Sequence, residues 1–161
     1  MAPYRAELDP AAADGAPAHI TVLGPFLDIE GVRSDERARL RALFAAAARF
    51  DFSLVRVARF TGVLFLAPDP PEPFVSLTEA VWRSWPKFPP YRGAYDEIVP
   101  HLTVAVGDDR FVEVEKALTP LLPITATVDE VWLIARGPDG RWVRTETFRL
   151  DGPGARDVRA G

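Results

Sequence analysis

The chain has 161 residues, of which 48% are hydrophobic and 26% are charged, and its formal net charge is −4. This composition can bury the core of one domain and excludes a disordered chain. The absence of cysteine excludes disulfide bonds, thiolate metal sites and a cysteine nucleophile. The acidic charge argues against a broad nucleic-acid backbone binder, and no apolar run is long enough to span a bilayer. We therefore expect a cytoplasmic protein without membrane contact.

The first half of the chain is predicted to contain a strand, a helix and a hairpin after a short lead-in. The segments are an irregular lead-in at 1–16, a strand at 18–23, a helix at 34–49 and a hairpin at 51–67. Ser34 is placed to cap the helix, and Leu40 and Phe44 recur at the spacing of one helical face. Thr61 and Gly62 form the expected hairpin turn.

The second half repeats this order after a Pro-rich break and an additional helix. The segments are a helix at 74–85, a loop at 86–100, a strand at 101–106, a helix at 109–122 and a hairpin at 124–150. Pro86 ends the first of these helices, and Asp108 or Asp109 can cap the second. Residues 151–161 are expected to form a flexible tail.

The chain has only two histidines, and they begin matching tetrapeptides. His19 and His101 are each followed by an apolar residue, by Thr21 or Thr103, and by a second apolar residue. Side chains at i and i+2 of a strand share a face, so each histidine is expected beside a threonine while the apolar pair faces the core. One such match is commonplace, because threonine is frequent in strands. Two matches at equivalent places favour a functional site.

The internal repeat predicts a single bilobal domain at 17–150. Each half supplies a His-led strand, a helix and a hairpin, so two similar lobes related by a pseudo-two-fold axis are expected. The two histidine strands would then face each other across a cleft.

Two imidazoles and two hydroxyls suit the cleavage of a phosphodiester. One imidazole can take a proton from the attacking water and the other can protonate the leaving oxygen, because their pKa lies near neutrality. Thr21 and Thr103 would donate hydrogen bonds to the nonbridging phosphate oxygens. A 2′,3′-cyclic phosphate is an apt substrate, since opening the ring relieves strain, and the same step with a 5′-hydroxyl replacing water would be ligation. We assign His101 as the base and His19 as the acid.

No metal or other cofactor is expected from this inventory. Two histidines without cysteine make a poor zinc site. The sequence also lacks a Gly-x-Ser-x-Gly motif and a Gly-rich phosphate-binding loop.

The two motifs resemble those of the 2H phosphoesterase superfamily, which includes 2′-5′ RNA ligases and 2′,3′-cyclic nucleotide phosphodiesterases. Residues 18–26 and 97–106 are especially similar to a bacterial branch of 2′-5′ RNA ligase-like proteins. The resemblance implies an α+β fold in which two antiparallel sheets flank a central cleft, with helices on the outside. It also implies metal-independent catalysis by the two histidines, with both threonines holding phosphate, on an RNA end or a small cyclic nucleotide.

The N-terminus departs from the family pattern. Family members begin with a strand and a helix before the first motif, whereas only 18 residues precede His19. One sheet is therefore expected to lack a strand, and an open edge would invite a homodimer. This departure keeps open an alternative function, a nucleotide-binding or RNA-end-binding module that retains the two-histidine cleft without catalysis.

Further candidates for substrate binding lie outside the two motifs. Tyr95 could stack on a base or pack on its own lobe, and Arg92 could bind phosphate or remain a solvated surface residue. Phe26 could line the cleft or belong to the core. Arg56 and Arg59 lie on a predicted strand that could face either the cleft or the outside.

Overall fold

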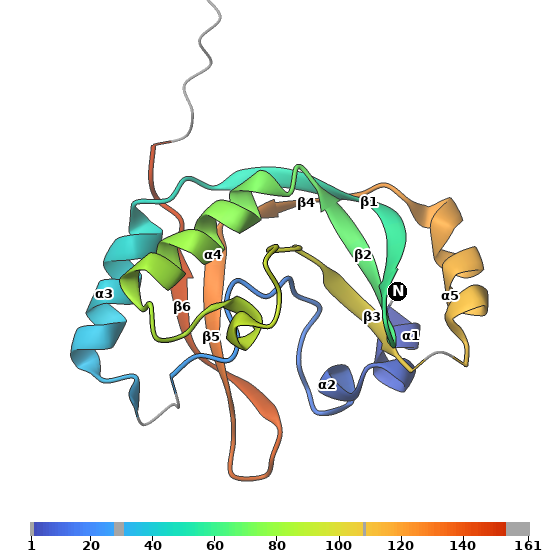
Figure 1. The fold of residues 1–161 in the computed structure, drawn as a ribbon, viewed down its shortest axis with the longest axis horizontal. Coiled ribbons are helices and arrows are strands. Elements are labelled where there is room, and N and C mark those ends of the chain that lie inside the picture. Colours follow the sequence, from blue (N-terminus) through green and yellow to red (C-terminus); the bar gives the residue numbers. More distant parts are fainter. Residues whose placement is uncertain (1, 28–30, 108, 154–161) are drawn as a thin grey trace, which may run out of the picture.

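The computed structural model describes residues 2–27, 31–107 and 109–153, which form two antiparallel sheets of unequal size (Figure 1). The larger, curled sheet has the strand order β3-β2-β1-β4. Its strands are β1 (Phe50–Phe60), β2 (Val63–Asp69), β3 (Leu102–Val106) and β4 (Ile124–Val128). The smaller sheet pairs β5 (Glu130–Arg136) with β6 (Trp142–Arg149). The predicted α+β class with two antiparallel sheets is confirmed.

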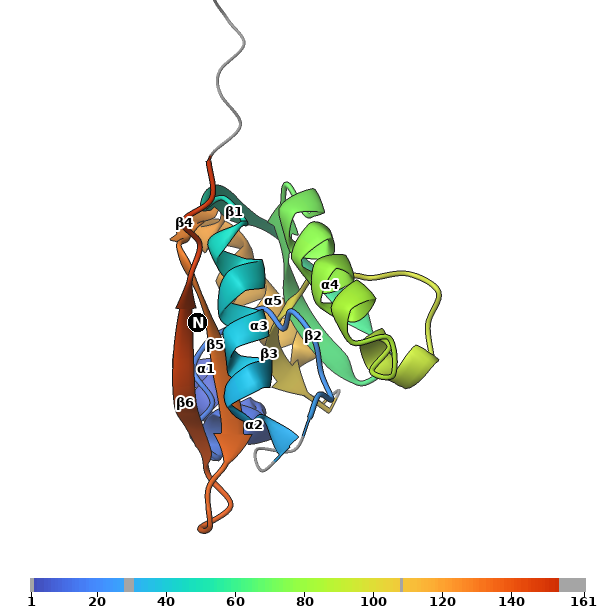
Figure 2. The same ribbon diagram turned by 90° about the vertical axis from the view of Figure 1, so that its left-hand side faces the viewer.

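Helices lie against both sheets. They are α1 (Ala2–Leu8), α2 (Pro10–Ala13), α3 (Ser34–Ala45), α4 (Glu72–Ser84) and α5 (Phe111–Leu118), with short 3-10 helices η2 (Pro90–Gly93) and η3 (Thr119–Leu121). α5 lies outside the large sheet, while α3 and α4 lie at the end of the molecule that carries the small sheet (Figures 1 and 2).

Two hydrophobic clusters hold these layers together. In the first, Leu64 of β2 and Val104 of β3 pack with Val114 of α5, and all three side chains are fully buried. In the second, Phe44 of α3 and Val81 of α4 belong to the cluster that includes residues of β6. Complete burial of such a side chain contributes about 1.5–3 kcal/mol. The predicted core face of α3, with Leu40 and Phe44, is therefore confirmed.

The two halves of the sequence do not each build their own lobe. β1 and β2 come from the first half, yet they share a sheet with β3 and β4 from the second. The predicted hairpin at 124–150 is wrong in its first strand, because β4 pairs with β1 and only β5 and β6 pair with each other. The repeat predicted the order of elements, but strands distant in sequence decide the pairing.

The irregular structure expected at 1–16 is also wrong for much of that segment, because α1 and α2 form there. The Asp9 carboxylate accepts a hydrogen bond from the Ala11 amide at 3.0 Å and caps α2. The Arg5 side chain of α1 donates from Nε to the Thr103 carbonyl of β3 at 2.9 Å. α1 therefore covers part of the β3 edge, where an exposed strand edge would otherwise invite pairing.

Residues 18–23 do not form the predicted strand, and in the described part of the chain they join neither sheet. Ile20 packs against the first cluster, whereas Val22 packs against the second. The Val22 carbonyl accepts a hydrogen bond from Thr78 Oγ1 of α4 at 2.6 Å. The segment thus crosses between two cores, and its alternating apolar residues reflect burial rather than strand pairing.

The predicted helix caps are wrong at both positions that the structure describes. Arg33 and Arg110 occupy the N-cap positions of α3 and α5, and neither side chain makes a capping hydrogen bond. Asp108 and residues 154–161 of the expected tail lie outside the described residues. The predicted turn between β1 and β2 is confirmed, and Gly62 adopts a φ of +73° there, which glycine favours.

Candidate active site

His101 and Thr103 share one face of the large sheet at the start of β3. Thr103 lies opposite Phe65 of β2, and Phe65 lies opposite Ala58 of β1. The His101 ring meets Phe60 and Phe65 edge-on, with centroid distances of 5.1 and 5.5 Å. Directly opposite residues in a sheet share a face, so Thr103, Phe65 and Ala58 lie on the same side. The ring contacts put His101 and Phe60 on that side too.

The other face of the same strands is the one that α5 covers. Leu102 lies opposite Leu66, and both belong to the buried cluster with Phe111 and Val114 of α5. The second motif therefore buries its leucine and turns His101 toward the opposite side, as the alternation predicted.

The first motif is attached to the small sheet. His19 is partly buried and Thr21 is exposed, both in the irregular segment that follows α2. At the start of that segment, the Asp14 carbonyl accepts a hydrogen bond from the Trp142 amide at 2.8 Å. The Asp14 carboxylate pairs with Arg136 at 2.8 Å. These two bonds join the segment to both strands of the small sheet.

Both imidazoles are held by the same kind of backbone contact. Nδ1 of His19 lies 2.8 Å from the Pro17 carbonyl oxygen, and Nδ1 of His101 lies 2.7 Å from the Val99 carbonyl oxygen. A carbonyl oxygen only accepts hydrogen bonds, so Nδ1 must carry the hydrogen in each ring. Nε2 of the neutral ring then keeps its lone pair and can accept a proton.

Tyr91 makes a hydrogen bond to the same backbone carbonyl that orients His101. Its hydroxyl donates to the same Val99 oxygen at 3.2 Å, and a carbonyl oxygen has two lone pairs for two donors. Burial raises the pKa of Tyr91, so the phenol remains protonated and able to donate at neutral pH. Sequence reasoning missed this role, because the contact depends on the path of the loop between the two residues.

Within residues 2–27, 31–107 and 109–153, the other predicted binding residues make no hydrogen bond, ion pair or ring contact with either histidine. Tyr95 is 72% exposed and meets the Tyr91 ring edge-on at 5.7 Å. Arg92 is exposed, with a φ of +58°. Phe26 packs edge-on against Trp85 at 5.5 Å in the second cluster, so core packing accounts for its position. A role in substrate binding remains a prediction for all three.

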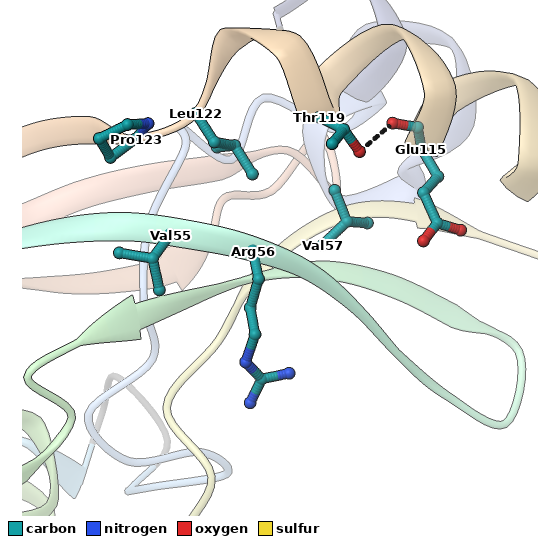
Figure 3. A pocket seen from close by; sticks show the side chains of 7 residues that line it. All are labelled: Val55, Arg56, Val57, Glu115, Thr119, Leu122 and Pro123. Atoms are coloured by element: carbon teal, nitrogen blue, oxygen red, sulfur yellow. Dashed lines mark hydrogen bonds between the residues drawn. The ribbon is translucent and has the colours of Figure 1, made fainter.

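Two hollows lie away from the histidines. One, of about 450 Å³, lies between β1 and α5 and is shown in Figure 3. In it, Thr119 Oγ1 donates to the Glu115 carbonyl at 2.7 Å. The other, of about 250 Å³, lies between α3 and α4. Neither is lined by a histidine, so the candidate site is a face of the sheet and not one of these hollows.

Residues 2–27, 31–107 and 109–153 contain no group of three or more histidine, cysteine or acidic side chains that could hold a metal ion. The helices in those ranges are also not long and apolar enough to cross a membrane. Nδ1 of His101 and the Tyr91 hydroxyl both bond the Val99 carbonyl oxygen.

Solved structures of other proteins share this fold. TT0787 from Thermus thermophilus has a TM-score of 0.60 and 21% identity, over 85% of this chain and 81% of that one. Escherichia coli LigT, in a crystal structure complexed with 3′-AMP, has a TM-score of 0.53 and 19% identity, over 91% and 83% of the two chains. The chain therefore shares its fold of two antiparallel sheets with TT0787 and LigT.

A family model assigns the chain more closely. The model of the 2′-5′ RNA ligase superfamily matches residues 1–140, a range that includes both histidine motifs and the N-terminal helices. The chain belongs to this superfamily, which confirms the resemblance inferred from the motifs. No curated protein matches the sequence significantly.

Proposed function

We propose that this protein opens 2′,3′-cyclic phosphates at RNA or nucleotide ends by acid–base catalysis with His19 and His101. Attack by a 5′-hydroxyl in place of water would open the same ring and form a 2′-5′ linkage, a ligation that is reversible. Membership of the 2′-5′ RNA ligase superfamily supports this class of chemistry. The structure of the fold relative LigT was determined with 3′-AMP, which supports a nucleotide substrate here. The observation that carries the two-histidine mechanism is the matched Nδ1–carbonyl bond in both motifs.

The mechanism assigns complementary roles to the two Nε2 atoms. Nε2 of His101 takes a proton from water as the water oxygen attacks phosphorus. The bond from phosphorus to a ribose ring-closing oxygen breaks on the opposite side, and Nε2 of protonated His19 gives that oxygen a proton. The product is a phosphate monoester beside a free hydroxyl. Nδ1 stays bound to its carbonyl throughout, so each ring keeps its orientation while its proton moves.

Thr21 and Thr103 are assigned to the nonbridging phosphate oxygens. Negative charge on these oxygens increases along the reaction, so a hydroxyl donor aimed at them stabilises the transition state more than the bound substrate. Thr103 is well placed for this role, because it shares the sheet face of His101.

The test is turnover of adenosine 2′,3′-cyclic phosphate by the parent protein and by His19→Ala and His101→Ala. Each substitution should lower kcat by about 10²–10⁴-fold, the usual contribution of a positioned acid or base. Arg83→Met, which removes an exposed side chain of α4, is the control and should keep parental activity. Parental rates in both histidine variants would overturn the mechanism.

The irregular path of residues 18–23 favours one alternative, a binding module that holds a nucleotide end without turning it over. An imidazole outside a sheet is oriented only by local contacts, and acid–base catalysis depends on that orientation. Calorimetry with adenosine 2′-phosphate beside the turnover assay separates the two functions. Binding without turnover would select the module.

A further inference from the structure

Arg56 lies on the same face of the large sheet as His101 and Thr103. Arg56 of β1 is directly opposite Ala67 of β2, and the next pair along is Ala58 with Phe65. Phe65 is in turn opposite Thr103. Opposite residues share a face and residues two apart on a strand share it too, so Arg56 continues the surface that carries the second motif.

A β-bulge places the arginine on this side. Val55 is the extra residue, because Leu54 pairs with Pro68 while Arg56 already pairs with Ala67. Leu54 belongs to the buried cluster under α5, and without the bulge Arg56 would share its face. Figure 3 shows the Arg56 side chain extending to the side of β1 opposite α5.

The Arg56 guanidinium is exposed, and no ion pair or hydrogen bond to it occurs among residues 2–27, 31–107 and 109–153. Its neighbours toward the second motif are Ala58 and Ala67, which have short side chains. Arg59, three residues further along β1, is the contrast. It pairs with Glu115 of α5 on the other face.

Arg56 lies two strands away from Thr103, which would bind the phosphate held by the motifs. Two strand spacings and two residues along β1 put its Cα about 12 Å from that of Thr103 on a flat sheet. Thr103 and Arg56 are thus far enough apart to bind different phosphates of one substrate. A second phosphate of the same substrate, one nucleotide away, suits a long side chain that reaches across the alanines. Guanidinium also binds phosphate with two parallel hydrogen bonds.

We propose that Arg56 binds the internucleotide phosphate that precedes the cyclic end, so that the protein prefers an oligonucleotide end to a single cyclic nucleotide. This inference rests on the proposed function and deepens it by naming the substrate class. The acidic net charge of −4 is consistent with recognition of one or two phosphates and not of a long backbone.

The experiment compares two substrates that differ by one nucleotide. They are adenosine 2′,3′-cyclic phosphate and the dinucleotide ApA that ends in the same cyclic phosphate. Arg56→Gln should lower the ratio of kcat/KM for the dinucleotide to that for the mononucleotide by about tenfold or more, as expected for a lost charged hydrogen bond. The dependence of log(kcat/KM) on log[salt] should become shallower by about 0.7, the value for one contact to a single strand.

Arg59→Gln is the matched control, because it removes the same charge from the same strand but on the other face. It should keep both the substrate ratio and the salt slope of the parent. A ratio that is unchanged in Arg56→Gln, or that falls equally in both variants, would overturn the proposal.

A separate outcome concerns the proposed function itself. If the parent turns over neither substrate, that function fails, and calorimetry then decides the role of Arg56. Adenosine 2′-phosphate and ApA with a terminal 2′-phosphate are the probes. Arg56→Gln should abolish the tighter binding of the dinucleotide, and a parent with equal affinity for both probes would overturn the proposal.

Discussion

His19 and His101 make the same hydrogen bond, from Nδ1 to the carbonyl oxygen two residues earlier, at 2.8 and 2.7 Å. The two histidines differ in their secondary structure, since His101 directly precedes β3 and His19 lies in an irregular segment. The shared feature is therefore the short backbone path before each ring and not the strand. This bond fixes which nitrogen of each ring carries the hydrogen and leaves Nε2 for proton transfer.

The pH dependence of turnover should report both imidazoles. One ring must be neutral to accept a proton and the other must be protonated to donate one, so kcat/KM should follow a bell-shaped curve. The measurement is kcat/KM for a cyclic nucleotide between pH 4.5 and 9.5 in buffers of constant ionic strength. A profile that changes in only one direction would leave the two-histidine assignment without support.

Tyr91→Phe should lower kcat without abolishing turnover. The substitution removes only the hydroxyl that donates to the Val99 carbonyl, and that carbonyl orients His101. The loss of one neutral hydrogen bond predicts a decrease of about two- to tenfold in kcat, with KM nearly unchanged. A purely structural role would instead lower the melting temperature and leave kcat at the parental value. Arg83→Met again supplies the control.

The same residue should influence stability in alkaline solution. Burial raises the pKa of Tyr91 in the folded chain, whereas the unfolded chain titrates near 10. Above that pH the unfolded state loses the phenolic proton while the folded state keeps it, so the free energy of unfolding falls as pH rises. Tyr91→Phe should make this fall less steep in urea unfolding experiments between pH 8.5 and 11. An unaltered slope would show that Tyr91 ionises equally in both states.

The fold was most predictable where structure follows local sequence. β1 and β2 were predicted from their content of valine, phenylalanine and leucine, and α4 from apolar residues at helical spacing, of which Phe74, Leu77 and Val81 are buried. The pairing of β4 with β1 was not predictable in this way, because it joins residues far apart in the sequence. The helix α1 was also missed, because its buried Arg5 reads as a surface residue until its partner Asp9 is in place.

The candidate site was predictable to a similar degree. The alternation in the second motif predicted which way Leu102 and Thr103 turn, because β3 is regular at those residues. The sheet face on which Arg56 lies was not predictable, because a one-residue bulge at Val55 moves Arg56 to the opposite face and carries no sequence signal. The hydrogen bond from Tyr91 to the Val99 carbonyl depends on the conformation of a loop, and loops lack the periodicity that makes strands and helices predictable.

The buried pair of Arg5 and Asp9 should couple the N-terminal helices to β3. Their side chains are only 7% and 4% exposed, and Arg5 also bonds the Thr103 carbonyl. Arg5→Met leaves a buried carboxylate without its counter-charge and should cost about 3–5 kcal/mol of unfolding free energy. The double variant Arg5→Met, Asp9→Asn should cost less than the sum of the two single variants, by about 0.5–3 kcal/mol. Additive losses in urea unfolding would contradict the pairing.

An exposed pair provides the comparison. Arg83 and Glu79 of α4 are 75% and 48% exposed at their side chains, so Arg83→Met should change stability by less than about 1 kcal/mol. A loss as large as that of Arg5→Met would mean that burial is not the reason for the effect at Arg5.

Phe60 should matter more for activity than for stability. Its ring stacks on Phe65 at 4.3 Å and meets His101 edge-on, yet it is 40% exposed. Phe60→Ala should lower the free energy of unfolding by about 1–2 kcal/mol, less than the usual 3–5 kcal/mol for a fully buried phenylalanine. Phe65→Ala should approach that larger loss, because Phe65 is only 3% exposed. In contrast, Phe60→Ala removes one of the two aromatic walls of His101 and should lower kcat for a cyclic nucleotide severalfold. Parental kcat in Phe60→Ala would show that the Val99 carbonyl and Phe65 alone hold the imidazole in place.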